Sequence, residues 1–395
     1  MAKPKIRFKG YTNDWEQRKF SDVVDIGSGM DYKHLEEGNI PVYGTGGYML
    51  SVNKALSDDK DAIGIGRKGT IDKPYILRAP FWTVDTLFYC IPKENYDLDF
   101  TSCIFQNVDW KKKDESTGVP SLSKIIINNV ETATPTFDEQ KKVGNYFRSL
   151  DNLITLHQRK CDQAKKLKKY MLQKMFPKNN KSVPEIRFEG FSNDWEQRKL
   201  GDILISLQNN TLSRADLTNE VGIAKNVHYG DVLIKFGEVL DVSKEKLPMI
   251  SDESVLSKYK SSFLQNGDVI VADTAEDSTV GKCSEITGLN DVVVLSGLHT
   301  IPYRPVEKFA TGYLGYYLNS GAYHNQLIPL MQGIKVTSIS KSAMQDTDIV
   351  YPKSVEEQGK IGDYFQSLDY FITLHQKKCD QLKNLKKFML QNMFV

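Results

Sequence analysis

The chain has 395 residues, of which 40% are hydrophobic and 26% charged, and its formal net charge of +2 neither indicates nor excludes binding to nucleic acid. Because single hydrophobic cores stop growing near roughly 250–300 residues, we expect at least two domains. The sequence has no apolar run near the roughly 18 residues of a membrane span, no secretory signal at its start and no CxxC motif among its five cysteines, so it predicts a cytoplasmic protein without a membrane segment, a disulfide framework or a zinc ribbon.

The chain opens with a segment that occurs twice. Residues 4–26 match residues 184–206 at an offset of 180, and the core of the match is the heptapeptide NDWEQRK. A match of this length between unrelated stretches is very improbable, so we interpret the chain as a duplication. We interpret the repeated Trp15 and Trp195 as anchors that hold the first element of each half in its core.

Residues 27–134 form a first insert that predicts mostly short strands. Runs such as NIPVYGTGGYML and FWTVDTLFYCI combine β-formers with turn residues. Residues 64–69, GIGRKG, match the glycine pattern of a dinucleotide-binding turn, but that turn requires a following helix, and β-formers with a proline follow here. We therefore favour a tight hairpin, with Arg67 and Lys68 near its tip either facing a ligand or simply solvated.

Two more polar features of this insert are candidates for ligand contact. The basic run Lys111, Lys112 and Lys113 beside Trp110 fits either a phosphate contact or a solvated turn. Residues 116–124, STGVPSLSK, form a polar turn that precedes the next long element. We expect this turn to be a loop directed at a ligand.

Residues 139–176 carry the clearest helical signal. Apolar or small residues recur in alternating steps of four and three, which is a heptad seam, and only Lys168 breaks the row. The pattern predicts one helix of roughly 38 residues, about 57 Å long. Residues 357–394 repeat it at an offset of 218, with Lys386 at the break, and the two apolar stripes are expected to pack together. Seam positions include Leu150, Ile154, His157, Cys161, Leu368, Ile372, His375 and Cys379.

A twofold relation between the halves would make these helices antiparallel, so that their midpoints meet near His157. His157, Cys161, His375 and Cys379 would then lie close together. Two histidines and two cysteines fit a zinc site in principle, but their seam register favours ordinary core packing.

The second insert, between the second opening segment and the second helix, also predicts strands and turns. Its stretch ADTAEDSTVGKC corresponds to the hairpin that contains GIGRKG. Its residues 331–341, MQGIKVTSISK, correspond to residues 116–124, although the two inserts share little sequence otherwise. We expect a common scaffold that carries two divergent binding loops.

This duplicated pattern resembles the specificity subunit of type I restriction-modification systems. The resemblance rests on a Trp-Glu-containing opening, a β-rich variable region and a Glu-Gln pair that begins a long helix with the sequence TLHQ, each present twice. It covers essentially the whole chain, although Cys161 and Cys379 stand where the family usually has an aliphatic residue. It implies an α+β fold of two β-rich target-recognition domains in a pseudo-twofold arrangement, joined by two long antiparallel coiled-coil helices. The expected domains are residues 1–136 and 178–353, and the expected helices are residues 137–177 and 354–395.

The resemblance also implies a function. Each domain would read one half of a bipartite, asymmetric double-stranded DNA target. Two adenine-N6 methyltransferase subunits and separate ATP-driven restriction/translocase subunits would be the partners, with S-adenosylmethionine, ATP and Mg²⁺ bound by those partners and no cofactor or metal bound by this chain. The candidate DNA-contacting residues are Arg67, Lys68, Lys111, Lys112, Ser116, Thr117, Ser121, Gln332, Lys335, Thr337 and Ser338.

The sequence gives no support for catalysis by the chain itself. It contains no Walker A motif and no Asn/Asp-Pro-Pro-aromatic motif of adenine methyltransferases, so we expect a non-catalytic subunit. A scaffold whose inserts bind proteins rather than DNA is the main alternative. A fused methyltransferase-nuclease is a third, which the missing motifs disfavour.

Overall fold

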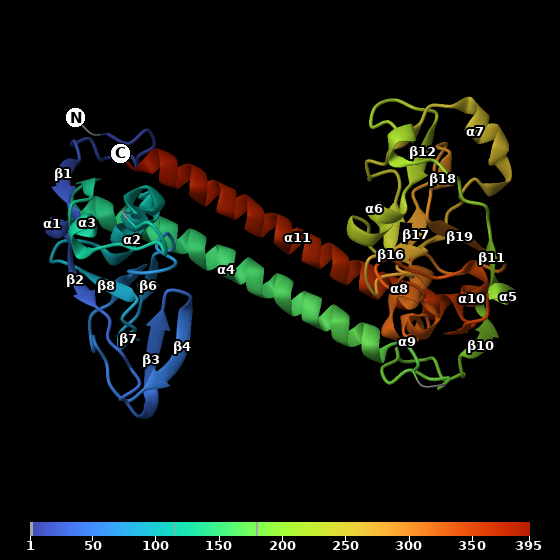
Figure 1. Cartoon of the computed structure of the whole chain (residues 1–395), viewed down its shortest axis with the longest axis horizontal. Helices are drawn as coiled ribbons and strands as arrows, with labels where there is room; N and C mark the ends of the chain where they lie inside the picture. Colours follow the sequence, from blue (N-terminus) through green and yellow to red (C-terminus); the bar gives the residue numbers. More distant parts are fainter. Residues whose placement is uncertain (1–2, 115, 179–180) are drawn as a thin grey trace. The chain divides into compact units, whose positions relative to one another are not determined.

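The computed structural model describes residues 3–114, 116–178 and 181–395 and divides into two compact units (Figure 1). Unit 1 comprises Met1–Arg159 with His375–Val395, and unit 2 comprises Lys160–Leu374. Each unit therefore holds one β-rich insert and one end of each long helix. Among the described residues, no helix has both the length and the apolar character needed to cross a membrane.

Unit 1 is built on a four-stranded antiparallel sheet of order β2-β8-β5-β6. A three-stranded sheet, β4-β3-β7, and the pair β1-β9 complete its strands. The strands are β1 (Glu16–Lys19), β2 (Val24–Ser28), β3 (Glu37–Gly44), β4 (Gly47–Val52), β5 (Ala62–Gly66), β6 (Tyr75–Leu77), β7 (Trp82–Thr83), β8 (Leu87–Pro92) and β9 (Glu131–Thr134). The short helices are α1 (Phe20–Val23), α2 (Leu98–Asn107), the 3-10 helix η1 (Trp110–Lys113) and α3 (Lys124–Asn128). The central strand β5 is buried along its whole length.

Unit 2 has a five-stranded sheet of order β11-β19-β15-β17-β13, with a three-stranded sheet β14-β12-β18 and the pairs β10-β21 and β16-β20. The strands are β10 (Glu196–Lys199), β11 (Leu204–Ser206), β12 (Ala224–Val227), β13 (Val239–Asp241), β14 (Met249–Ile250), β15 (Val269–Ala272), β16 (Thr274–Ala275), β17 (Cys283–Thr287), β18 (Val294–Ser296), β19 (Thr300–Pro305), β20 (Thr337–Ser338) and β21 (Asp348–Tyr351). The helices are α5 (Leu200–Ile203), η2 (Arg214–Asp216), α6 (Tyr229–Ile234), α7 (Glu253–Lys258), η3 (Lys260–Ser262), α8 (Tyr313–Asn319), α9 (Gly321–His324), η4 (Ile328–Leu330) and α10 (Lys341–Gln345). The order β2-β8-β5 of unit 1 thus recurs as β11-β19-β15.

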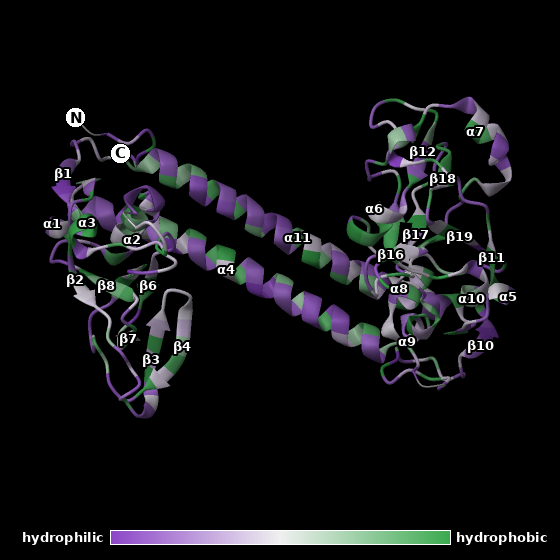
Figure 2. Cartoon of the chain, viewed as in Figure 1, coloured by the Kyte–Doolittle hydropathy of each residue, from purple (hydrophilic) through white to green (hydrophobic). Residues whose placement is uncertain are grey.

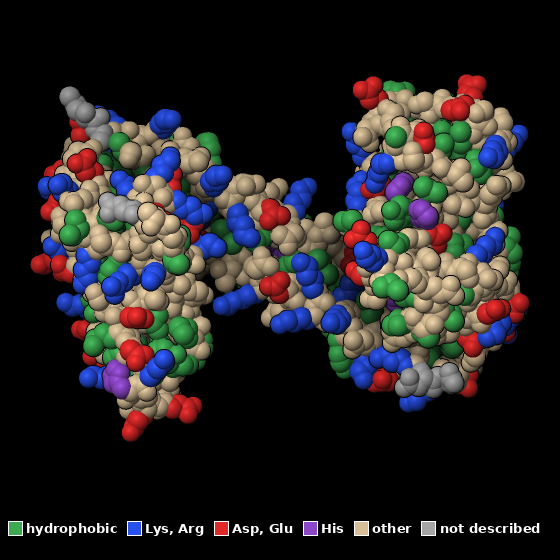
Figure 3. All heavy atoms as spheres, in the orientation of Figure 1, with side chains coloured by type: hydrophobic (Ala, Val, Ile, Leu, Met, Phe, Trp, Pro, Cys, Tyr) green, Lys and Arg blue, Asp and Glu red, His purple; other side chains and the backbone are tan. Residues whose placement is uncertain are grey.

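The long helices are α4 (Phe137–Lys174) and α11 (Val355–Met393), close to the bounds that the heptad pattern predicts. Both are amphipathic (Figure 2), and Lys and Arg side chains prevail on their exposed sides in Figure 3. In unit 1, Lys386 pairs with Asp151 at 2.7 Å, and in unit 2, Lys168 pairs with Asp369 at 2.6 Å. A second contact in each unit, between His157 and His375 in unit 1 and between Cys161 and Ile372 in unit 2, shows that the helices run antiparallel within each unit, as predicted.

The middle of the helix pair brings the expected histidines together. The Nδ1 atoms of His157 and His375 lie 2.7 Å apart. The thiols of Cys161 and Cys379 lie 3.8 Å and 3.9 Å from the carbonyl oxygens of Ile372 and Ile154, and the Cys379 thiol also lies 3.5 Å from Gln158 Oε1. Over residues 3–114, 116–178 and 181–395, no group of three or more His, Cys, Asp or Glu side chains is arranged to hold a metal ion.

The repeated tryptophans anchor each unit against the end of a long helix. Trp15 is buried, and its ring centroid lies 5.9 Å from that of Phe394, which follows α11. Trp195 is buried next to Phe176, which follows α4, at 6.4 Å. The opening segment of each half therefore packs on the helix end of the other half, which explains why both segments recur together.

A buried ion pair also recurs in each unit. Arg7 donates two hydrogen bonds of 2.7 Å to Glu139 at the start of α4. Arg187 donates hydrogen bonds of 2.7 Å and 2.9 Å to Glu357 at the start of α11. Glu357 also accepts a hydrogen bond from the indole N–H of Trp195 at 3.2 Å. Such bidentate pairs fix the opening segment to the helix geometrically.

Candidate nucleic-acid interface

Two loops of unit 1 are joined through their backbones. The loop that follows β5 contains Arg67 and Lys68, and Arg67 O accepts a hydrogen bond from Leu122 N at 2.9 Å. Lys68 forms an isolated antiparallel bridge with Ser121. Gly69 has a φ of 94°, a conformation that suits glycine, and its N–H donates to Pro120 O at 2.8 Å. β5 then pairs with β6, which confirms a hairpin and places a strand, not a helix, after GIGRKG, but the connection, residues 67–74, is longer than the tight turn that the sequence predicts.

The side chains of Arg67, Lys68 and Thr117 are exposed, whereas Ser116 and Ser121 are only partly exposed and the Ser116 hydroxyl is buried. The Arg67 guanidinium lies 5.9 Å from the ring centroid of Phe88, which orients it without burying it. Asp114 shapes the second loop because its carboxylate accepts from the N–H groups of Ser116 and Ser121, each at 3.0 Å. These N–H groups hold the pKa of the Asp114 carboxyl below its usual range. The structure thus gathers Arg67, Lys68, Ser116, Thr117 and Ser121 on one pair of loops.

Lys111 and Lys112 lie beside this loop pair on η1, and each has an acidic partner. Lys111 is 2.9 Å from Asp72, in the turn between β5 and β6, and Lys112 is 3.2 Å from Asp109. All four groups are at least partly exposed, so these pairs hold the lysines only weakly. Their contact with phosphate stays a prediction.

Unit 2 builds the corresponding loop pair in the same way. β15 is followed by Asp273 and the short strand β16, which pairs with β20. Asp273 O accepts from Ile339 N at 2.9 Å, and Gln332 and Ser338 exchange two backbone hydrogen bonds of 2.9 Å and 2.8 Å. The tight turn between them requires Gly333, whose φ is 114°. This loop pair holds all four predicted DNA-contacting residues of unit 2, which are Gln332, Lys335, Thr337 and Ser338.

The two loop pairs are structural equivalents that carry different chemistry. The sequences SLSK and SISK place a capping serine at the start of α3 and α10, where Ser123 and Ser340 accept from backbone N–H groups. The residue just before each capping serine donates its backbone N–H to a carbonyl oxygen of the other loop, which is that of Arg67 in unit 1 and that of Asp273 in unit 2. Arg67 and Asp273 are therefore equivalent. One unit therefore presents an arginine and a lysine where the other presents an aspartate and a threonine.

The sequence matches the stretch ADTAEDSTVGKC, residues 272–283, to the GIGRKG hairpin, but it does not single out Asp273 within that stretch. Thr274 donates to Asp273 at 2.8 Å, and His299 Nδ1 lies 3.5 Å from the same carboxylate. A surface hollow beside this cluster is lined by residues from β11 to α10, among them Gln208, Asn209, Asp273, Ser340 and Lys341. The match between SLSK and SISK was the available signal, but it points to Asp273 only once the strand pairing is known.

Each loop pair also exposes apolar side chains. Val119 and Val336 stand two residues before the equivalent serines Ser121 and Ser338, and both are exposed. Ile334, at the tip of the unit 2 loop, is fully exposed. Backbone hydrogen bonds hold both loops, so these apolar groups are displayed on ordered turns.

Comparison with known proteins places this architecture in a family. The sequence model described as "Type I restriction modification DNA specificity domain" matches residues 12–166 and 192–384. The chain is 26% identical over 283 residues to the type I restriction enzyme MjaVIII specificity subunit of Methanocaldococcus jannaschii, a match that covers 70% of this chain and 64% of that protein. It is 23% identical to the putative type I restriction enzyme MjaX specificity subunit of the same organism, over 68% of this chain and 59% of that protein. The chain thus spans less than two thirds of either relative.

A solved structure has the same fold. The crystal structure of the type I restriction-modification system S subunit from M. genitalium superposes with a TM-score of 0.67 at 14% identity, covering 100% of this chain and 99% of that one. The family match covers both halves of the duplication and most of the chain. The chain belongs to the type I restriction-modification DNA specificity family.

Proposed function

We propose that this chain is the DNA-specificity subunit of a type I restriction-modification complex and that each unit reads one half of a bipartite, asymmetric DNA target. The observation that carries this proposal is the equivalence of Arg67 and Asp273, which are held by matching hydrogen bonds in otherwise matching loop pairs. One framework with two different sets of side chains is what a reader of two different half-sites needs.

The exposed side chains fit the chemistry of base edges and phosphates. Arginine pairs in a bidentate manner with guanine in the major groove, whereas a carboxylate such as Asp273 accepts from the amino group of cytosine. Lys68 and Lys335 are exposed on the same loops and suit phosphate contacts. Val119 and Val336 suit apolar contact with thymine methyl groups.

Exposed apolar residues on the helices support two identical protein partners. In unit 1, Leu156, Leu385 and Phe388 are exposed, and each immediately precedes a seam position. Their repeat equivalents in unit 2 are Leu374, Leu167 and Tyr170, which are exposed as well. Because the helices are antiparallel, residues that precede the seam lie on the same side of both helices. Each unit therefore offers the same apolar surface, which suits one copy of an adenine-N6 methyltransferase.

We assign methylation and ATP-dependent restriction to the partner subunits and not to this chain. The methyltransferase copies would bind S-adenosylmethionine, and the restriction/translocase subunits would bind ATP and Mg²⁺. The role of this chain is to place two methyltransferases over two half-sites and to connect them to the restriction subunits.

The test is to map methylated adenines by single-molecule sequencing in a host that expresses the methyltransferase partner with or without this chain. We expect methylation at one gapped, asymmetric motif only when this chain is present. Identical methylation in both hosts, with the partner shown to be active, would favour a scaffold that binds proteins alone.

A further inference from the structure

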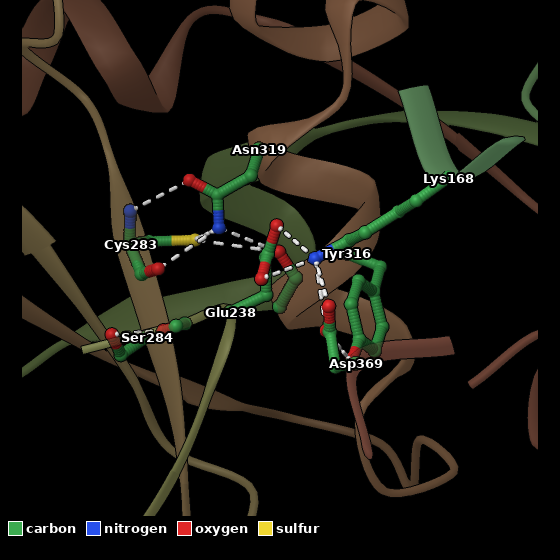
Figure 4. Close-up of polar contacts among 9 residues, drawn as sticks. Lys168, Glu238, Cys283, Ser284, Tyr316, Asn319 and Asp369 are labelled. Carbon is green, nitrogen blue, oxygen red and sulfur yellow. Dashed lines mark hydrogen bonds and ion pairs between the residues drawn. The ribbon is translucent and has the colours of Figure 1, made fainter. Parts of the chain in front are cut away.

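The two lysines that interrupt the seam have different surroundings. In unit 1, Lys386 pairs with Asp151 across the helices at 2.7 Å and 2.9 Å, and no carboxylate of the insert joins them within the described part of that unit. In unit 2, Lys168 pairs with the equivalent Asp369 and also with Glu238, which belongs to the insert (Figure 4). The same seam position is therefore an internal helix contact in one unit and a contact with the recognition domain in the other.

The Lys168 cluster, consisting of Lys168, Glu238, Tyr316 and Asp369, joins α4, α8, α11 and the loop segment just before β13. The ammonium of Lys168 lies 2.9 Å from both oxygens of Glu238 and 2.6 Å and 2.9 Å from those of Asp369. The Tyr316 hydroxyl, on α8, donates to Asp369 at 2.6 Å, and Lys168 lies 5.2 Å from the centroid of the Tyr316 ring. Only 14% of the Lys168 side chain is exposed, so water screens these contacts little.

The backbone around Glu238 makes this contact rigid. Glu238 O accepts from Glu285 N at 2.9 Å, which attaches the Glu238 segment to β17. The Glu285 carboxylate in turn accepts from the N–H groups of Gly312 and Gly315 at the start of α8, at 2.6 Å and 3.0 Å. A Cβ on Gly315 would lie 2.1 Å from Glu238 O, so α8 packs on this peptide only because position 315 is glycine.

The corresponding attachment in unit 1 is weaker. There the insert carboxylate is Asp99, which lies 3.2 Å from Arg148 on the side of α4. Half of the Arg148 side chain is exposed, at 51%, and exposed pairs constrain geometry little. Position 366 of α11, the repeat equivalent of Arg148, is a glutamine, so this contact is not part of the common framework.

We propose that the Lys168 cluster is a positioning device that fixes the angle of the unit 2 recognition domain on the helix pair and thereby restricts the DNA gap that the complex accepts. Apolar packing between α8 and the helices stabilises their contact but has little directional preference, whereas the hydrogen bonds from Lys168 to Glu238 and Asp369 and from Tyr316 to Asp369 require a defined orientation. The consequence for DNA rests on the proposed function. A change of one base pair in the gap moves the second half-site by ~3.4 Å and rotates it by about 35°.

The first measurement examines domain attachment without DNA. Spin labels at Lys169→Cys on α4 and Ser257→Cys on α7 report a distance within unit 2, and the native cysteines are all buried. We expect a single narrow distance distribution in the otherwise unchanged protein and a broadened one in Glu238→Gln and in Lys168→Met. Methionine at position 168 completes the apolar seam, so that variant tests loss of the contact without loss of helix pairing. Glu245→Gln, which removes an exposed partner of Lys235, is the matched control and should leave the distribution narrow.

The second measurement uses the complete complex with its methyltransferase partner on duplexes whose gap is lengthened or shortened by one base pair. The preference for the native gap should fall by at least about tenfold in Glu238→Gln and Lys168→Met, with methylation of the native gap retained, and should be unchanged in Arg148→Gln. Unchanged spin-label distances in both variants would overturn the inference whatever the DNA result. Broadened distances with an undiminished gap preference would overturn its consequence for DNA. Absence of methylation with the unaltered chain would count against the proposed function, and the spin-label result would still decide the inference.

Discussion

The backbone N–H of Ile339 donates to the carbonyl oxygen of Asp273 at 2.9 Å and so joins the loop after β15 to the loop before α10. Leu122 and Arg67 make the same contact at 2.9 Å in unit 1. A hydrogen bond between backbone groups depends little on the identity of the neighbouring side chains. The reading residues can therefore diverge between the two units while the loops keep their relative positions.

Arg67→Ala should impair recognition by unit 1 alone. If Arg67 contacts a base, its loss should reduce methylation of the cognate target by about tenfold to a hundredfold and relax the preference at one position of the first half-site. Lys68→Ala should weaken binding similarly for all sequences and lower the salt dependence of binding by about one ion. Quantitative methylation of a randomised first half-site and binding titrations in increasing salt measure these effects.

Two further variants serve as controls for Arg67→Ala and Lys68→Ala. Arg18→Ala removes an exposed arginine of β1 that pairs with Glu16, and it should change neither measurement. Asp273→Asn should alter preference in the second half-site only. Relaxation of the second half-site by Arg67→Ala would contradict the assignment of one half-site to each unit.

Loss of the buried ion pair should lower the free energy of unfolding more in unit 2 than in unit 1. Glu357→Gln leaves Arg187 without its carboxylate and weakens the bond from Trp195, which should lower the free energy of unfolding by about 3 kcal/mol. Glu139→Gln likewise leaves Arg7 without its carboxylate. In unit 1, however, Trp15 Nε1 has no hydrogen-bond partner among the described residues, so no tryptophan bond is weakened and the free energy of unfolding should fall by less. Urea unfolding of the two variants gives the comparison, and an equal or larger loss in Glu139→Gln would contradict it.

The stability of the chain should depend on pH through Glu285. Burial raises the pKa of this carboxyl from its ordinary value of 4.5 to about 7, although N–H groups of α8 favour the charged form. The folded chain then holds a proton that the unfolded chain has released. The contribution of Glu285 to the free energy of unfolding should therefore be largest at acidic pH and fall by up to about 3 kcal/mol as the pH rises from 4.5 to 7.

Glu285→Gln has no proton to lose at this position, so its unfolding free energy should lack this part of the pH dependence. Urea unfolding at a series of pH values between 5 and 8 compares the two proteins. Parallel curves over this range would contradict the raised pKa.

The apolar surfaces on the helices should each bind one methyltransferase. Leu156→Glu combined with Phe388→Glu places two charges on the unit 1 surface and should remove one methyltransferase copy from the complex. Leu374→Glu combined with Tyr170→Glu should remove the other copy. Native mass spectrometry counts the copies.

Lys383→Glu is the control for this experiment, because Lys383 is exposed on α11 but follows a seam position instead of preceding it. It should leave both copies bound. Two bound copies in the doubly substituted variants would place the docking surfaces elsewhere.

The sequence predicts those features of the fold that depend on local periodicity or on the duplication. The heptad steps predict the two helices, and a twofold relation between the duplicated halves predicts their antiparallel pairing and the proximity of His157 and His375, which lie 2.7 Å apart. The hairpin at Arg67 followed from the turn residues after β5. Each of these inferences uses neighbours in sequence or a copy of the same segment.

Features that depend on distant strand pairing could not be predicted. The sequence brings the GIGRKG and ADTAEDSTVGKC stretches into correspondence, but only the hydrogen bonds to Leu122 and Ile339 show that Arg67 and Asp273 are the equivalent residues. Lys168 was recognised as a break in the seam, but its partner Glu238 lies in the insert, where no pattern connects it to a helix. The seam explains why a lysine is unusual there, and only the tertiary structure shows what it contacts.

Whether each unit reads one half-site is tested most directly by exchanging residues 27–134 for the corresponding insert of another family member and sequencing the methylated adenines. We expect the first half-site to change while the second half-site and the gap stay the same, because the loops of unit 2 and both long helices are untouched. A change in both half-sites, or methylation at the original motif, would contradict it.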